Sequence, residues 1–551
     1  MKIEFQRIWI AFIIFSFFPG LSNATSGRYR CTWRNTPATS MVIGWDQISG
    51  HSPVVYYDVI DFGVQADAYR FNHQPDRIIN SKGMNNHFAR LENLKPNTVY
   101  FFVIKDSEGT SKRMSFKTAP DNANERLSII AGGDSRNNRS ARCDANRLVS
   151  KLRPHFVMFD GDMTGGDTYE EWKEWFDDWQ LTIGSDGRIF PVLAARGNHE
   201  AANSSITELF DVSNNDVYYA LTFGGDLLRV YTLNSMIAPG GNQSLWLEGD
   251  LKANTQVQWK FAQYHQAMRP HTAKKPEKDE LIIHWAGLFY GYSVNLVLES
   301  DAHVVKITYP IRPSNEAGSD EGFIRDDENG TVYMGEGCWG APLRTNDDNK
   351  DWTRCSGSFN QFKWVFIDKD KIEIRTVRTD GSQSVAEVSH NNIFEPPIGL
   401  VIWNPAAGDV VTIRNKKAVA ANQVAANQST QESSQQNALP PGKPAAEKNT
   451  ASNSNPPEPN PSDPNDWSSF PKVVPDDKGS TVVKFSLQQS CDVSMQLVNQ
   501  QWQKIASIDF PKQPIGEIVK SIDMSKVPAG QYLLVIKGNG KLVRRYRVEV
   551  K

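Results

Sequence analysis

Between about residues 125 and 414, short apolar runs alternate with stretches of helical periodicity. Such runs, ending at or near polar residues, are typical of buried strands that end at a functional edge of a sheet. The runs are LSIIAG (127–132), FVMF (156–159), PVLAA (191–195), LLRVYTL (227–233), FAQY (261–264) and VNLVLE (294–299). Helices are predicted over residues 141–152 and 169–180. Trp172, Trp175 and Trp179 share one face of the second helix, which favours burial in a core over a sugar-binding platform.

The flanking regions show β-periodicity. Residues 27–120 contain short alternating runs such as MVIGW and VYYDVI, separated by turn-rich segments and without a sustained helical period. Residues 418–466 are rich in Ala, Asn, Gln, Ser and Pro and lack aromatic residues, which predicts a flexible linker because too little apolar surface is available for folding. Residues 468–551 alternate again, and Gly538-Asn539-Gly540 predicts a hairpin turn.

Length and composition indicate a globular protein of several domains. At 551 residues the chain is too long for one hydrophobic core, so about two to four domains are expected. A hydrophobic content of 39% and a charged content of 22% exclude a disordered or fibrous chain. The net charge of −3 contains no polybasic excess, so nucleic acid is not expected as an obligate partner.

The N-terminus predicts export. Lys2 and Arg7 precede the apolar run IWIAFIIFSFF, and Ser22-Asn23-Ala24 places small residues where a signal peptidase cleaves, after Ala24. A membrane anchor is the alternative, but the run is short and Pro19-Gly20 interrupts it. We therefore expect a secreted or cell-surface protein without a transmembrane anchor in the mature chain.

The chain has five cysteines, so at least one is unpaired. In an oxidising compartment Cys338 and Cys355 are the expected disulfide partners, because they bracket a polar loop. Buried free thiols are the alternative. Cys31, Cys143 and Cys491 stay unassigned.

Five short segments place a metal-ligand type just after an apolar run. They are GGDSR, DGDM, RGNHE, YHQ and ESDAH, and their candidate ligands are Asp134, Asp162, Asn198, His265, Asp301 and His303. Hard oxygen and borderline nitrogen donors suit a multivalent cation that activates water. Two adjacent metal ions would supply a nucleophile near neutral pH and neutralise the phosphoryl oxygens of a phosphate ester. The pattern therefore predicts a metal-dependent hydrolase.

The order D…GD…GNHE…H…(H/D)-x-H resembles that of the calcineurin-like metallophosphoesterases. The segments LKPNTVY and FKTAP resemble the closing strands of a fibronectin III-like sandwich, which precedes the catalytic domain in purple acid phosphatases. This resemblance covers roughly residues 28–414 and implies a four-layer α/β catalytic domain. The C-terminal PAGQY segment, followed by a strand, a turn and a basic strand, resembles the type A sorting domain of type IX secretion substrates. The alternative is a small C-terminal β-sandwich without that role.

The resemblance implies a role for each candidate residue. Asp162 would bridge two metal ions, Asp134 and His303 would complete the first site, and Asn198 and His265 would hold the second with Asp301 as a fourth ligand. His199 would face the substrate phosphate, and Glu200 would fix the His199 tautomer. His271 is a weaker candidate for an acid near the leaving group, with an exposed loop histidine as the alternative.

Three departures from the family pattern affect the metal. Arg136 stands where the family has a histidine, Gly165 replaces the tyrosine that colours purple acid phosphatases, and Asp301 replaces a histidine. A ferric-tyrosinate centre is therefore not expected, while iron, manganese, zinc and calcium stay open. Arg136 would clamp a phosphoryl oxygen, with a surface salt bridge as the alternative. Trp339 and Arg344 would wall a substrate pocket, or else belong to a buried loop packed around a disulfide.

The predicted fold class is multidomain: a fibronectin III-like β-sandwich, a four-layer α/β metallophosphoesterase domain and a small C-terminal β-sandwich. The expected boundaries are a signal peptide over 1–24, the sandwich over 25–120, the catalytic domain over 121–416, a linker over 417–467 and a sorting domain over 468–551.

The expected function is that of a secreted phosphatase that binds two metal ions and hydrolyses phosphate monoesters by metal-bound hydroxide. Its expected partners are a small phosphate ester and the type IX secretion machinery. The alternatives are a phosphodiesterase or nucleotidase of the same fold, and a non-catalytic surface binding protein whose metal site has decayed.

Overall fold

The structure, a computed structural model, describes residues 25–415 and, with short gaps, residues 472–550. The predicted signal peptide and linker lie outside the described residues. The chain divides into two compact units, one up to Gln435 and one from Gln436 onward. No helix among the described residues is long and apolar enough to cross a membrane.

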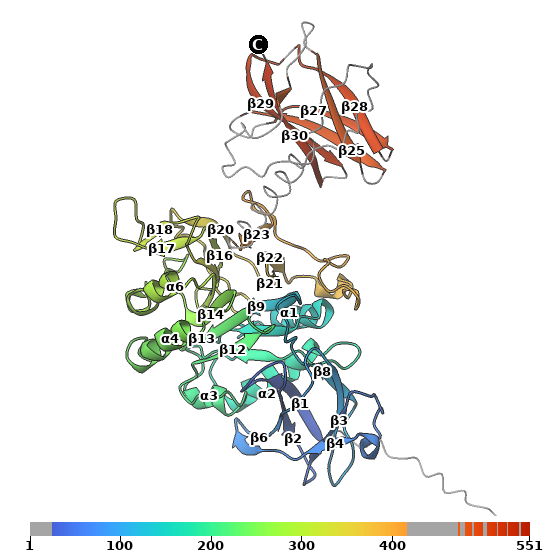
Figure 1. Ribbon diagram of the computed structural model, residues 1–551, viewed down its shortest axis with the longest axis vertical. Coiled ribbons are helices and arrows are strands. Elements are labelled where there is room, and N and C mark those ends of the chain that lie inside the picture. The colour runs from blue at the N-terminus through green and yellow to red at the C-terminus, as the bar shows by residue number, and fades with distance from the viewer. Residues whose placement is uncertain are drawn as a thin grey trace, which may run out of the picture. The chain divides into compact units, whose positions relative to one another are not determined.

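The N-terminal part is the predicted β-sandwich, shown in blue in Figure 1. One sheet has the order β1-β2-β6-β5 and the other β4-β3-β7-β8. Their bounds are β1 (Ser26–Thr32), β2 (Met41–Gln47), β3 (Val54–Asp58), β4 (Phe71–His73), β5 (Arg77–Ser81), β6 (Met84–Leu91), β7 (Val99–Lys105) and β8 (Met114–Lys117). The side chains of Ile43, Trp45 and Phe102 are fully buried between the sheets.

Two mixed sheets form the centre of the α/β domain. The first has the order β11-β10-β9-β21-β22-β23 and the second β12-β13-β14-β15-β19-β16-β20. The first consists of β9 (Leu127–Gly132), β10 (Phe156–Phe159), β11 (Val192–Ala194), β21 (Gln361–Ile367), β22 (Lys371–Arg378) and β23 (Val410–Arg414). The second consists of β12 (Tyr219–Phe223), β13 (Leu228–Thr232), β14 (Trp259–Gln266), β15 (Leu296–Ser300), β16 (Val305–Thr308), β19 (Val332–Gly335) and β20 (Thr353–Gly357). All six predicted apolar runs are strands.

Helices cover the outer face of each sheet (Figure 1), which completes the predicted four layers. The main ones are α1 (Arg139–Leu152), α2 (Tyr169–Trp179), α3 (Asn203–Thr207), α4 (Asn242–Ala253) and α6 (Gly287–Gly291). Helix α2 begins with a capping box in which Thr168 and Glu171 bond each other's backbone N–H groups. Its three tryptophans are buried, as predicted, and Trp175 and Trp179 pack edge-on against Phe159 of β10.

Alternation along the second sheet separates two cores. Val230, Phe261 and Leu296 belong to the core shared with the first sheet, whereas their neighbours Tyr231 and Ala262 face the layer of α4 and α6. Burial on both faces explains why these strands appear in the sequence as continuous apolar runs.

The sandwich is held against the α/β domain by charged contacts. The buried carboxylate of Asp211 accepts hydrogen bonds from Arg34, Arg77 and Arg90. Lys82 donates to Asp167 at 2.6 Å, and the same Asp167 oxygen accepts from the backbone and side chain of residues that follow the GNHE segment. The N-terminal part therefore supports a loop of the candidate site.

The second unit is a β-sandwich, as predicted, with a five-stranded sheet of order β24-β30-β29-β26-β27 and a two-stranded sheet of β25 and β28. Its strands are β24 (Lys472–Val473), β25 (Ser480–Leu487), β26 (Cys491–Val498), β27 (Lys504–Gln513), β28 (Gly516–Asp523), β29 (Gly530–Gly538) and β30 (Lys541–Val550). Strands β29 and β30 pair from Gly538 and Lys541 outward, which confirms the predicted hairpin. The turn at residues 539–540 lies outside the described residues.

The predicted disulfide is wrong, because all five cysteines are free thiols. Cys338 is buried against Val305 and Phe359, and Cys355 lies on β20 opposite Ile307. Strand β16 lies between β20, which contains Cys355, and β19, the strand that precedes Cys338.

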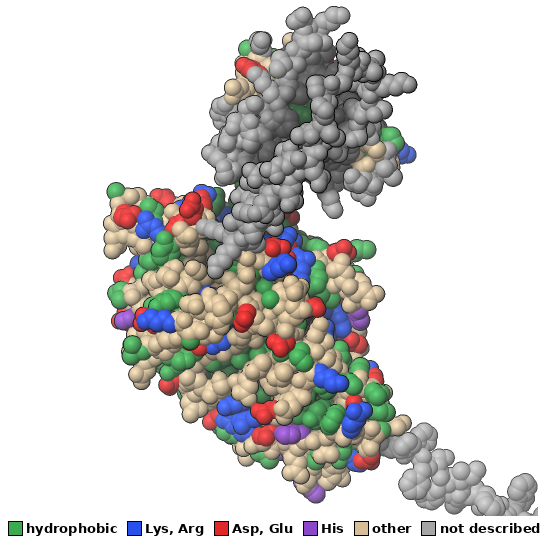
Figure 2. Space-filling model, viewed as in Figure 1, with side chains coloured by type: hydrophobic (Ala, Val, Ile, Leu, Met, Phe, Trp, Pro, Cys, Tyr) green, Lys and Arg blue, Asp and Glu red, His purple; other side chains and the backbone are tan. Residues whose placement is uncertain are grey.

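Acidic, basic and apolar side chains are interspersed on the face shown in Figure 2. This mixture agrees with the net charge of −3.

We predict that Trp175→Ala lowers the free energy of unfolding by about 3–5 kcal/mol, because it removes a buried ring that stacks on Trp179 and donates to Ser135 Oγ. Guanidinium unfolding followed by circular dichroism measures this loss. Leu245→Ala, at a side chain that is 68% exposed, is the control and should change stability by less than about 0.5 kcal/mol. A loss as small as the control's would show that the tryptophan cluster is not a core.

Candidate metal centre

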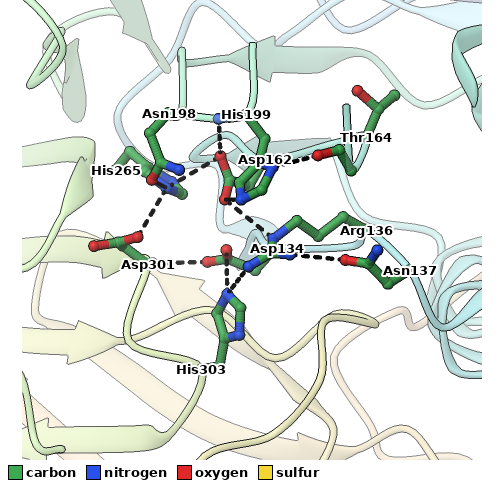
Figure 3. Close-up of polar contacts among 12 residues, drawn as sticks. Asp134, Arg136, Asn137, Asp162, Thr164, Asn198, His199, His265, Asp301 and His303 are labelled. Carbon is green, nitrogen blue, oxygen red and sulfur yellow. Dashed lines mark hydrogen bonds and ion pairs between the residues drawn. The ribbon is translucent and has the colours of Figure 1, made fainter. Parts of the chain in front are cut away.

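Five loops bring the six predicted ligands together (Figure 3). Asp134, Asp162 and Asn198 follow β9, β10 and β11 of the first sheet. His265 lies at the end of β14, and Asp301 and His303 follow β15 of the second sheet. Strands β9 to β11 run parallel to one another, as do β14 and β15, so each sheet gathers its loops at one edge.

The side chains form two clusters that share Asp162. In the first, ligand atoms of Asp134, Asp162 and His303 all lie within 4.8 Å of one another, and His303 Nε2 is 2.9 Å from Asp134 Oδ1. The second contains Asp162, His265 and Asp301, again within 4.8 Å. His265 Nε2 is 3.3 Å from Asp162 Oδ1 and 3.2 Å from the Asn198 side-chain oxygen.

The histidine orientations fit a bound cation. Nδ1 of His265 is 3.0 Å from the Asp160 carbonyl, and Nδ1 of His303 is 2.8 Å from the Pro342 carbonyl. A carbonyl oxygen only accepts, so both Nδ1 atoms carry hydrogen and both Nε2 atoms are left to face carboxylate oxygens. Lone pairs that converge in this way require a proton or a metal ion between them.

The pKa shifts in the second cluster also fit a bound cation. Burial works to lower the pKa of His265, but the charges of Asp162 and Asp134 outweigh it and hold that pKa well above its usual value. Burial works to raise the pKa of Asp162, yet the charge of His265 and hydrogen bonds from His265 and the His199 N–H hold it well below its usual value. The cluster therefore stabilises a positive charge at its centre.

Four of the six candidate ligand residues have a left-handed backbone. The φ angles are 55° at Asp134, 55° at Asp162, 67° at Asp301 and 55° at His303. Residues other than glycine rarely adopt this conformation, and it costs about 1–3 kcal/mol when the surrounding structure imposes it. The strain is concentrated where the side chains converge.

Glu200 ties two of the ligand loops together. Its carboxylate accepts from the backbone N–H groups of Asp162 at 3.0 Å, Met163 at 2.8 Å and Gly197 at 2.7 Å. The loops approach so closely that a Cβ on Gly161 would lie 2.4 Å from the Gly197 nitrogen, so a larger residue does not fit. Burial and the charge of Asp162 raise the pKa of Glu200 to about 7.

Three cations lie beside these carboxylates. Arg136 Nε is 3.3 Å from Asp162 Oδ2, and Arg136 Nη2 donates to His303 Nε2 at 3.4 Å. Lys275 contacts the Asp301 carboxylate, and Arg344 Nη1 donates to the Asp301 carbonyl at 2.6 Å. On the rim, Asn198 is exposed, and the His199 side chain is 27% exposed.

Two families match adjoining parts of the chain. The purple acid phosphatase N-terminal domain matches residues 27–118, and the calcineurin-like phosphoesterase matches residues 136–305. The phosphoesterase match lies within the α/β domain described above. The predicted resemblance is confirmed for these two parts of the chain, and with them the class of a phosphoric ester hydrolase.

Solved structures show the same fold. The purple acid phosphatase PPD1 from yellow lupin (Lupinus luteus) seeds is 14% identical, with a TM-score of 0.56 over 71% of this chain and 74% of that one. A PhoD structure is 10% identical, with a TM-score of 0.52 over 70% of this chain and 90% of that one. No curated protein matches the sequence. Calcineurin-like phosphoesterases are expected to hold two metal ions, and the two clusters of the phosphoesterase domain offer places for them.

Two predicted roles are wrong. Glu200 does not hold the His199 tautomer, because its oxygens are taken by three backbone N–H groups and His199 Nδ1 bonds the Gly165 carbonyl instead. His271 is neither a leaving-group acid nor an exposed loop residue. It is fully buried, with Nε2 2.7 Å from Thr353 Oγ1 and Nδ1 3.4 Å from Glu336.

The low solvent exposure of Trp339 and Arg136 contradicts two further predictions. Trp339 does not wall a substrate pocket, because it is fully buried and donates to Asn146 Oδ1 at 2.8 Å. Trp339 belongs to a buried loop, as the alternative predicted, but that loop does not pack around a disulfide. The alternative of a surface salt bridge for Arg136 is also wrong, since its side chain is 13% exposed and its partner Asp162 is fully buried.

Sequence reasoning missed Lys275 and Asp160. Lys275 lies in a charged stretch (KKPEKDE) with no spacing signal toward Asp301. Asp160 belongs to the same DGD segment as Asp162, but its Oδ1 accepts from Ser300 Oγ at 2.6 Å and its Oδ2 has no hydrogen-bond partner. Burial raises the pKa of Asp160 to about 8, so this carboxyl is protonated at neutral pH.

We predict that the metal-free protein loses stability as the pH rises through about 8, where Asp160 loses its proton. A buried carboxyl whose pKa is raised on folding stabilises the folded state below its unfolded pKa, and that contribution disappears as the pH passes the folded pKa. Asp160→Asn should flatten this dependence without abolishing it, since Glu200 acts in the same direction.

The measurement is urea unfolding of chelator-treated protein at pH 5, 7 and 9. Asp67→Asn, at an exposed side chain of the sandwich, is the control and should keep the wild-type profile. An Asp160→Asn profile as steep as that of the wild type would show that Asp160 is charged when buried.

Proposed function

We propose that the chain is an exported metal-dependent phosphatase that hydrolyses phosphate monoesters. The observation that carries the proposal is the convergence of two histidine Nε2 atoms on three buried carboxylates at the loop ends of a calcineurin-like phosphoesterase domain. These donors suit iron, manganese or zinc.

Asp162 would bridge the two ions, since it belongs to both clusters. Asp134 and His303 would hold the first ion, and Asn198, His265 and Asp301 the second. When bound, the metal ions supply an activated water and neutralise phosphoryl oxygens.

His199 is placed to serve the leaving group. Its Nδ1 bonds the Gly165 carbonyl, so Nε2 is the atom left to face the site, 3.8 Å from Asp162 Oδ2. A proton on that Nε2 can be donated to the leaving oxygen. The exposed Asn198 next to it marks the side from which a substrate can enter.

The surrounding cations favour monoesters over diesters. Arg136 contacts the Asp162 carboxylate, Lys275 contacts the Asp301 carboxylate, and Arg344 donates to the Asp301 backbone carbonyl, in addition to any bound metal. A phosphate monoester is a dianion with three unesterified oxygens, whereas a diester is a monoanion with two. More fixed positive charge therefore stabilises the monoester to a greater extent.

A non-catalytic surface binding protein is the second candidate. The observation that favours it is internal pairing, because Arg136 contacts Asp162 and Lys275 contacts Asp301. Metal content decides between the two candidates. A purified protein that binds no manganese, zinc or iron and hydrolyses no aryl phosphate would be the binding protein.

Export is part of the proposal on the basis of the N-terminal pattern and the C-terminal β-sandwich. Cleavage after Ala24 and passage through the type IX secretion machinery are its specific expectations. Peptide mapping of both ends of the protein from culture medium tests them.

We predict that Asp162→Asn and His265→Ala each remove bound metal and lower kcat/KM for an aryl phosphate by at least about 100-fold, because Asp162 is shared by both clusters and His265 is the histidine donor of the second. Elemental analysis and turnover measure the two effects. Arg139→Ala, at an exposed side chain outside the site, is the control. Full activity in either site variant would contradict the proposed centre.

We predict that Lys275→Ala lowers kcat/KM for an aryl monoester about tenfold more than for the matching diester, because it removes a cation beside the substrate phosphoryl group. Lys274→Ala changes the exposed neighbouring lysine and should affect neither substrate. Equal losses on both substrates would mean that Lys275 only holds Asp301 in place.

A further inference from the structure

The two clusters differ in how many of their candidate ligand atoms contact a cationic side chain of the protein. In the first, Arg136 Nε faces Asp162 Oδ2 at 3.3 Å, and Arg136 Nη2 donates to His303 Nε2 at 3.4 Å. The guanidinium thus contacts two of the three residues that would hold a metal ion there. The third, Asp134, accepts the Asp301 N–H at 2.7 Å through its Oδ2.

In the second cluster, fewer candidate ligand atoms contact a lysine or arginine side chain. His265 Nε2 faces Asp162 Oδ1 at 3.3 Å, the Asn198 oxygen at 3.2 Å and Asp301 Oδ1 at 3.7 Å. Among these oxygens only Asp301 Oδ1 contacts a side-chain ammonium or guanidinium group in the described residues, namely Lys275.

Arg136 is held where it is. Its Nη1 donates to Asn137 Oδ1 at 2.8 Å. Its Nε is buried from solvent and, among the described residues, has no hydrogen-bond partner and only the ion pair with Asp162. A guanidinium stays charged at any physiological pH. A histidine can release its proton and bind a metal ion in its place, but Arg136 cannot.

We infer that Arg136 is the resident cation of the first cluster, so that the chain binds one metal ion tightly at the second cluster and another only weakly at the first. Arg136 thereby sets the metal stoichiometry of the site. This inference rests on the proposed function only in placing metal ions at these residues.

The experiment is titration of chelator-treated full-length protein with Mn²⁺ by calorimetry, with metal content measured after dialysis. The wild type should retain one equivalent, and its second binding step should be about 100-fold weaker than the first. Arg136→Ala should tighten that second step by about 10- to 100-fold and retain two equivalents. Arg136→Lys should fall between them, since one ammonium cannot cover both contacts.

Two controls keep the result interpretable. Arg139→Ala removes a neighbouring exposed arginine at the start of α1 and should leave both binding steps unchanged. Circular dichroism checks the fold of each variant, and Arg136→Gln, which removes the charge but keeps a polar side chain, gives the same measurement if Arg136→Ala does not fold.

The outcomes separate this inference from the proposed function. Two tight equivalents in the wild type, unchanged in the Arg136 variants, would overturn the role of Arg136 and leave the phosphatase proposal intact. One equivalent in both the wild type and the uncharged variants would overturn it as well. No Mn²⁺ binding by any variant would overturn both proposals.

Discussion

The whole site depends on how the buried negative charge of the Asp162 carboxylate is compensated. Asp162 is fully buried and has a left-handed backbone, its Oδ1 faces His265, and its Oδ2 faces Arg136. A buried anion is tolerated only when opposite charge and hydrogen bonds compensate it. His265, Arg136 and the His199 N–H provide that compensation, and Glu200 holds the surrounding backbone in place.

Two carboxyl groups of one tripeptide segment have opposite protonation states for the same reason. Asp160 is buried beside Ser300, and burial raises its pKa to about 8. Asp162 faces His265, and its pKa falls well below the usual value. Of these two aspartates, the fold therefore leaves charge only on the one that points into the site.

The scaffold delivers these groups from distant parts of the chain. The first sheet contributes three loops and the second sheet two, while the N-terminal sandwich supports the GNHE loop through Lys82 and Asp167. Backbone strain at four ligand positions is tolerated because the two packed sheets fix where each loop begins and ends.

Local patterns were sufficient to predict six strands of the α/β domain, the buried face of α2, and Asp162 with the five side chains that converge on it. Apolar periodicity and the residues that follow each strand are properties of short segments, and the topology of parallel strands then places those residues at one edge. Local patterns could not predict the role of Glu200, the burial of His271 or the free thiols. His271 meets Thr353 across 82 positions and Lys275 meets Asp301 across 26, so no local pattern encodes either contact. Residue type and order decided which chemistry the chain can perform. The packing of the two sheets decided which groups are buried, which are charged and which cation reaches Asp162, because desolvation and Coulomb energies depend on distances that only the folded chain sets.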